Sequence, residues 1–130
     1  MIQRIQTVFL FIIAIVSVIG FFFLPPLDFY ILGLLVPTLL KSYIILTSSL
    51  AFLSLMIFKR RKTQLIINRM NFFLQIAMTG VLVFGLLNAN DLNSFLLWLF
   101  MPFQSMVLLI LSSRAIQKDD DLIRSIDRLR

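Results

Sequence analysis

The sequence predicts an all-α integral membrane protein, with four transmembrane helices followed by a C-terminal amphipathic helix in the cytoplasm. Hydrophobic residues make up 60% of the 130-residue chain, whereas soluble domains contain about 45–50% apolar residues even with glycine counted. The apolar residues fall in four long runs, and most Lys and Arg residues lie between or after these runs. Polar residues are too few to cover a water-facing surface, so the composition does not favour a soluble helical bundle.

Each apolar run is long enough to cross a bilayer, because about 20 helical residues span the roughly 30 Å of hydrocarbon. The first run stops at Pro25 and Pro26, where proline blocks a helical turn. We expect it to stay as an uncleaved helix, because no small-x-small cleavage site follows. The apolar connection at 28–41 contains Gly33 and Pro37, and its conformation stays open. The expected spans are residues 5–27, 39–58, 68–87 and 92–113, within a transmembrane domain at 1–113.

The positions of the cations predict which side of the membrane each loop faces. Eleven of the twelve Lys and Arg residues lie in the N-terminal segment, in the loop between the second and third spans, or in the tail. Lys41 alone lies on the opposite side. Because cations favour cytoplasmic loops, both termini are expected in the cytoplasm. This distribution also argues against nucleic-acid binding, which the net charge of +6 could otherwise suggest.

The chain contains no Cys, His or Glu, and its six acidic residues are all Asp. Thiol nucleophiles, sulfur-ligated metals and the usual general base near neutral pH are therefore missing. Ionisable residues inside a membrane mark proton relays and ion paths, but the four spans contain only Lys41 and Arg69, each at an edge. We therefore expect no catalytic residue, no cofactor site and no metal site, and we expect that the protein is not an enzyme.

Gln75 and Gln104 are the best candidates for a buried polar pair within the spans. The third and fourth helices are expected to be antiparallel neighbours, because only a short turn of Asn and Asp residues separates them. The two amides could therefore meet inside the bundle. Two interpretations stay open: an interhelical contact that stabilises helix packing, or a polar site for a ligand.

The cytoplasmic segments hold the other candidates. The loop at 59–62 is either an orientation signal beside anionic lipid headgroups or a docking patch for an acidic partner. The tail at 114–130 has an apolar stripe at helical spacing, which predicts an amphipathic helix continuing from the fourth span. It could lie on the membrane, fold back on the bundle, or dock a partner by its apolar face. The candidate partner or lipid contacts are Gln3, Arg4, Gln6, Lys59, Arg60, Arg61, Lys62, Ile116, Leu122, Ile123, Ile126, Arg128 and Leu129.

Two stretches carry a family resemblance: the start of the chain, MIQRIQT at 1–7, and its end, where RAIQKD leads through LIRS to the terminal DRLR. They resemble an uncharacterised family of four-helix bacterial membrane proteins, described as a domain of unknown function. Members often have another acidic residue such as Glu at the positions of Asp120 and Asp121, a departure that keeps the charge. The resemblance implies the same four spans and a location in the bacterial inner membrane, but it implies no activity.

These expectations combine into a non-catalytic membrane protein, an accessory or scaffold subunit of an envelope complex that engages partners through its cytoplasmic face. The alternative is a small homo-oligomeric transporter or channel, with the region of Gln75 and Gln104 lining its path. The expected partners are membrane lipids and a membrane or cytoplasmic protein, and a homo-oligomer also stays open.

Overall fold

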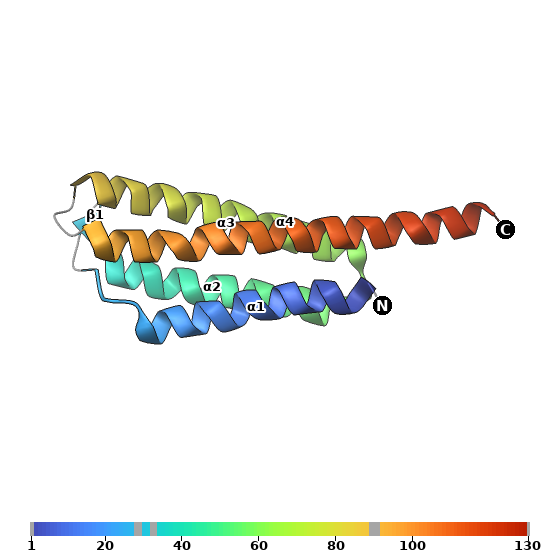
Figure 1. Cartoon of the computed structure of the whole chain (residues 1–130), viewed down its shortest axis with the longest axis horizontal. Helices are drawn as coiled ribbons and strands as arrows, with labels where there is room; N and C mark the ends of the chain where they lie inside the picture. Colours follow the sequence, from blue (N-terminus) through green and yellow to red (C-terminus); the bar gives the residue numbers. More distant parts are fainter. Residues whose placement is uncertain (1, 28–29, 32–33, 89–91, 130) are drawn as a thin grey trace.

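A computed structural model describes residues 2–27, 30–31, 34–88 and 92–129, which form four long helices and one small pair of strands (Figure 1). In chain order the elements are α1 (Ile2–Phe23), β1 (Tyr30–Ile31), β2 (Leu34–Leu35), α2 (Val36–Met56), α3 (Arg61–Asn88) and α4 (Leu92–Arg128). The two strands lie at one end of the bundle, which we call the hairpin end (Figure 1). At the opposite end, the bend end, α1 begins and α2 turns into α3.

Proline and charge account for the main helix boundaries. α1 ends at Phe23, just before the two prolines, since proline cannot continue a helical turn. α2 begins at Val36 with Pro37 in its first turn, where a missing amide donor costs nothing. α2 ends at Met56, before four consecutive cations that would be costly inside hydrocarbon.

The apolar connection between α1 and α2, whose conformation the sequence left open, contains a minimal antiparallel pair of strands. Tyr30 of β1 lies opposite Leu35 of β2, and Ile31 lies opposite Leu34. α2 follows directly after β2, three residues earlier than the expected start of the second span. The expected turn before α4 falls on residues 89–91, outside the described residues.

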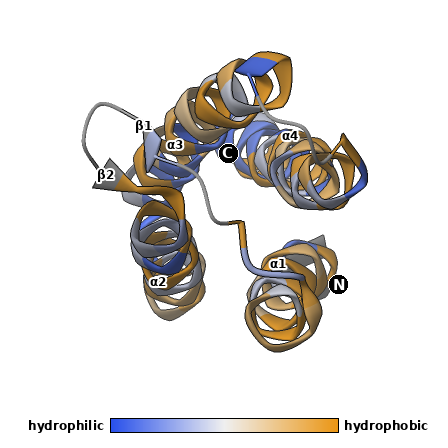
Figure 2. Ribbon diagram, turned by 90° about the vertical axis from the view of Figure 1, so that its left-hand side faces the viewer, coloured by the Kyte–Doolittle hydropathy of each residue, from blue (hydrophilic) through white to orange (hydrophobic). Residues whose placement is uncertain are grey.

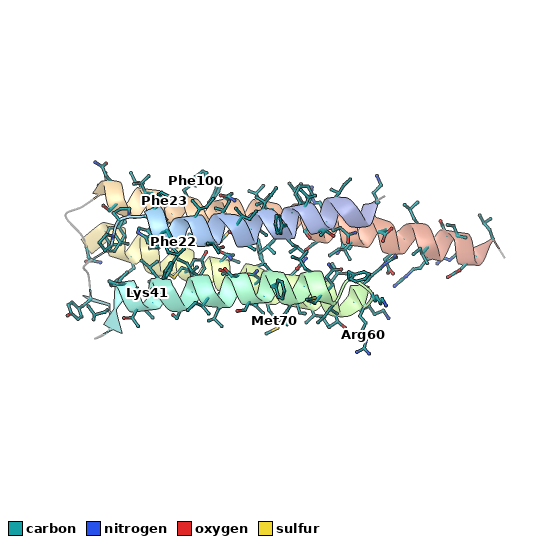
Figure 3. The ribbon with its side chains drawn as sticks, turned by 90° about the horizontal axis from the view of Figure 1, so that it is seen from below. Phe22, Phe23, Lys41, Arg60, Met70 and Phe100 are labelled. Atoms are coloured by element: carbon teal, nitrogen blue, oxygen red, sulfur yellow. The ribbon has the colours of Figure 1, made fainter. Side chains whose placement is uncertain are left out.

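The four helices lie side by side in a ring, in which α1 and α3 each contact both α2 and α4 (Figure 2). Each helix is long and apolar enough to cross a membrane, which confirms the four membrane-crossing helices predicted from the sequence. Large apolar side chains are exposed on the outside, including Phe22, Phe23 and Phe100 (Figure 3). Lipid chains rather than water suit such a surface, so this is a multi-pass membrane protein.

The tail was expected to continue from the fourth span as an amphipathic helix, and up to Arg128 it forms the last part of α4 rather than a separate element. α4 continues without a break for 37 residues, and its last turns extend beyond the other three helices (Figure 1). No Gly or Pro follows Pro102 in the sequence, so nothing stops the helix where the apolar run ends. Pro102 itself lies inside α4, as membrane helices tolerate.

Apolar side chains pack into two buried clusters along the bundle. The cluster nearer the hairpin end consists of Leu27, Val36, Leu40, Tyr43, Ile44, Met78, Leu82, Phe95 and Trp98. The second cluster consists of Leu10, Ile13, Ala51 and Leu109. The indole Nε1 of Trp98 donates a hydrogen bond of 2.7 Å to the carbonyl oxygen of Pro25. This bond holds the chain after α1 against α4.

Candidate functional site

The buried face of α3 is polar over half its length. Gln64, Asn68, Asn71 and Gln75 follow at spacings of four, three and four residues, so their side chains fall on one face of the helix. None of the four is more than 3% exposed. We call these four residues the polar column. The opposite face of α3 is apolar and exposed, which is the reverse of a helix in a water-soluble bundle.

The half of the polar column nearer the hairpin end bonds to α2. Tyr43 donates its hydroxyl hydrogen to the amide oxygen of Gln75. The amide nitrogen of Gln75 donates to Oδ1 of Asn71 at 3.1 Å, and Nδ2 of Asn71 donates to the backbone oxygen of Thr47 at 3.4 Å. The chain of donors and acceptors therefore runs continuously from one helix to the next.

In the half of the polar column nearer the bend end, the side chain of Asn68 connects three helices. The Ser54 hydroxyl of α2 donates to Oδ1 of Asn68 at 2.8 Å. Nδ2 of Asn68 donates to the hydroxyl of Ser112 on α4 at 3.4 Å. Because these groups are buried in the bundle, each amide must find its partners inside the protein. The polar column therefore fixes the rotation of α3 against both of its neighbours.

Gln104 does not join this arrangement. Among the described residues no hydrogen bond connects it to Gln75, which bonds to Tyr43 and Asn71 instead. Gln104 is half-buried, whereas Ser105 is buried. Successive residues of a helix are rotated by about 100°, so Ser105 faces the core and Gln104 lies at its edge. The expected contact between Gln75 and Gln104 is therefore not formed, and Gln75 bonds to Tyr43 and Asn71 in its place.

The site residues predicted from the sequence do not include Gln64, Asn68 and Asn71. Their spacing contained the signal, because three amides recur at helical intervals with Gln75. Gln64 lies just before the expected third span and Asn68 and Asn71 lie at its start, where hydropathy alone does not distinguish a buried polar residue from the end of an apolar run. Among the residues that the structure describes, no three His, Cys, Asp or Glu side chains lie close enough to hold a metal ion.

The predicted candidates at the N-terminus and in the basic loop take different places. Gln6 is 6% exposed, and within the described part of the chain its Nε2 has no hydrogen-bond partner. The side chains of Gln3 and Arg4 lie outside the described residues. Of the loop residues, Lys59, Arg60 and Lys62 are exposed. Figure 3 shows Arg60 at the bend end of the bundle.

Arg61 is directed into the protein rather than into solvent. Its guanidinium forms an ion pair of 2.8 Å with Asp119 and also donates to the backbone oxygen of Asp119 at 3.1 Å. Both side chains are less than one-fifth exposed. The pair attaches the start of α3 to α4 at the level where α4 leaves the bundle.

The end of α4 is uncovered beyond this ion pair. Ile116 is fully buried in the bundle, but every residue from 121 to 129 is exposed. The exposed apolar residues there are Leu122, Ile123, Ile126 and Leu129. Asp120 and Arg124 form an ion pair of 3.0 Å on the same segment. We call residues 120–128 the projecting end of α4.

Comparison with known proteins finds one family model. It matches residues 35–129 and is described as a domain of unknown function, DUF4293. The match includes the charged C-terminal stretch that carried the resemblance, but not the first seven residues. No curated protein and no solved structure matches the chain. Since the family model spans well over half of the sequence, the chain belongs to the DUF4293 family.

Proposed function

We propose that this protein is a non-catalytic accessory or scaffold subunit of an envelope complex in the bacterial inner membrane. Both termini lie in the cytoplasm, and the projecting end of α4 docks a protein partner there. The observation that supports this function is the uncovered apolar stripe on a helix that continues beyond the bundle. The absence of Cys, His and Glu and the near absence of charged residues from the spans support a non-catalytic role.

The distribution of exposed cations supports the proposed orientation. Lys59, Arg60 and Lys62 are exposed at the bend end, and Lys41 lies near the hairpin end (Figure 3). Short loops with many Lys and Arg residues stay in the cytoplasm. The bend end, and with it the projecting end of α4, is therefore the cytoplasmic side.

The direction of α4 favours docking to a protein over lying on the membrane. The segment continues α4 along the bundle axis (Figure 1), and that axis runs across the bilayer. From Asp119 to Arg128 the helix rises about 13 Å, so Leu122 and Ile126 move away from the lipid. An apolar stripe at such spacing fits a groove on a partner.

The test is co-purification in mild detergent from native membranes, with two variants of the full chain. We expect Leu122→Gln combined with Ile126→Gln to lose a stoichiometric partner that the unmodified protein retains. The matched control is Asp120→Asn combined with Arg124→Gln, on the opposite face of the same segment, which keeps the net charge and should retain the partner. Equal recovery of the partner with both variants would contradict the docking role.

A homo-oligomeric transporter or channel is the second candidate, and the polar column favours it. Gln64, Asn68, Asn71 and Gln75 place polar atoms along much of the bundle interior, which is where a polar solute would need them. The hydrogen bonds that Asn68, Asn71 and Gln75 form within α3 and with α2 and α4 favour a packing role instead. Solute flux into liposomes that contain the purified protein distinguishes the two, because a scaffold subunit produces none.

A further inference from the structure

We propose that a groove between α3 and α4 binds the phosphate headgroup of an anionic phospholipid, held by Arg69 and Arg114. The groove has a volume of about 230 Å³, and both arginines line it together with Ser113 and Gln117. This site is separate from the projecting end of α4, and it would stand if no protein partner existed. It also does not depend on which leaflet the bend end faces.

Arg69 and Arg114 have charges that the protein itself does not neutralise. Both side chains are exposed. Within the described ranges, the ion pairs are Arg61 with Asp119 and Arg124 with Asp120, so neither groove arginine takes part in one. Two guanidinium groups lining one groove suit a phosphate, because each can donate two parallel hydrogen bonds to its oxygens.

The acidic residue Asp121 lies close to this groove. Asp121 lines the next depression along α4, where Arg114, Gln117 and Lys118 also contribute. No ion pair joins Asp121 to these cations in the described part of the chain. With Arg69, Arg114 and Lys118 against one carboxylate, the region stays positively charged and attracts anions.

The depth of the groove matches the phosphate level of a bilayer. Arg69 lies 19 residues before the end of α3 at Asn88, which is about 29 Å along the helix. Arg114 lies 22 residues after the start of α4 at Leu92, about 33 Å along that helix. A hydrocarbon core is about 30 Å thick. If the hairpin end marks one interface, the two arginines therefore lie at the other.

The lining of the groove has the same polarity gradient as a phospholipid. Phe72 and Ile110 also line it, each about one turn closer to the middle of the membrane than the nearest arginine. Their apolar surface faces the level of the first acyl methylenes. Basic pockets between membrane helices bind anionic headgroups. The acyl chains of a lipid would contact the apolar residues of this groove, whereas a free phosphate ion has no apolar part to pack against them.

The experiment measures thermal unfolding of the full chain in a neutral detergent while lipid is added. We expect phosphatidylglycerol to raise the unfolding temperature, because a ligand that binds the folded state stabilises it. Phosphatidylcholine at the same concentration and inorganic phosphate should each give no comparable rise. A rise of equal size with inorganic phosphate would show a free-anion site and overturn the lipid proposal, as would an equal rise with phosphatidylcholine.

Two double variants locate the site. Arg69→Gln with Arg114→Gln should weaken the apparent affinity for phosphatidylglycerol about tenfold or more, since charged hydrogen bonds are lost. Lys41→Gln with Arg124→Gln removes two exposed cations outside the groove and should leave the affinity unchanged. The proposal fails if the first variant binds as the unmodified protein does, or if both variants weaken equally.

Should the groove variant not fold, the unmodified protein keeps the proposal testable. A photoactivatable phosphatidylglycerol with its reactive group near the headgroup is cross-linked in vesicles, and the modified peptides are identified by mass spectrometry. We expect labels on α3 near 69–72 and on α4 near 110–117. Labels confined to other helices would contradict the assignment.

Discussion

Gln75 and Asn68 lie on the same buried face of α3, yet hydropathy singles out only Gln75. Gln75 is surrounded by apolar residues, which makes a polar group at membrane depth obvious. Asn68 precedes Arg69 and looks like a residue at a helix end. The partners of Gln75 could not be predicted, because the rotation of one helix against the next depends on packing between helices and not on spacing along one of them.

The hydrogen bonds of Asn68 predict a cost for removing its amide. Asn68→Ala leaves the hydroxyls of Ser54 and Ser112 without this partner in the buried interior of the bundle. We expect a loss of about 1–2 kcal/mol in the free energy of unfolding, measured by titration with a denaturing detergent. Gln104→Ala is the control and should cost less than about 0.5 kcal/mol. Equal losses would show that the polar column does not stabilise the bundle.

Gly85 marks a close approach between α3 and α4. A Cβ atom there would lie 2.5 Å from Cε1 of Phe95, whereas one at Gly80 meets nothing within 4 Å. Gly85→Ala should therefore lower stability by about 1–2 kcal/mol, as overpacking does. Gly80→Ala should be neutral or stabilising by up to about 1 kcal/mol, because alanine favours a helix. Thermal unfolding of both variants in the same detergent measures these changes in stability. A larger loss for Gly80→Ala than for Gly85→Ala would contradict this packing.

At the scale of helices, apolar runs predict membrane crossings well and helix ends less well. Lys59–Lys62 marks the limit of the membrane between the second and third spans, but α3 begins at Arg61 and not at the expected residue 68. A helix continues wherever its residues tolerate helical geometry, whether or not they are apolar. The same reason explains α4, in which residues 114–128 extend the span as one helix.

The projecting end of α4 is a helical segment with few stabilising contacts of its own. Short isolated helices are marginal in water, and beyond the bundle this segment has one exposed ion pair, between Asp120 and Arg124. The contact of Arg61 with Asp119 holds its base. We expect backbone amides of residues 120–128 to exchange hydrogen faster than those of α4 inside the bundle.

Replacing the anchoring arginine tests this dependence. Arg61→Gln should speed exchange further at 117–128, because the base of the segment loses its ion pair. Arg60→Gln removes the adjacent exposed cation and should leave exchange there unchanged. Hydrogen exchange followed by mass spectrometry on both variants measures the difference. Identical exchange in the two variants would show that the ion pair does not hold the segment.

At the scale of the whole molecule, four membrane-crossing helices follow from hydropathy alone, because lipid imposes one strong constraint on every span. Their arrangement in a ring does not follow from hydropathy. Any of several helix orders would bury the same number of apolar residues. The polar column selects among them, since Asn68 needs α2 on one side and α4 on the other.

The orientation of the bundle can be tested at two matched positions. Thr38 and Thr63 are both exposed and each is the third residue of its helix, α2 at the hairpin end and α3 at the bend end. The chain has no cysteine, so Thr38→Cys and Thr63→Cys each introduce a single thiol without altering any charge. In the proposed orientation the bend end faces the cytoplasm, as the positive-inside rule predicts.

A thiol reagent that cannot cross the membrane containing the protein then reports the sidedness in intact cells. We expect labelling of Thr38→Cys and none of Thr63→Cys. After the membranes are opened with detergent both should react, which shows that each thiol is accessible. If Thr63→Cys reacts in intact cells and Thr38→Cys does not, the bundle is inverted. The projecting end of α4 would then face away from the cytoplasm, and a cytoplasmic partner could not reach it.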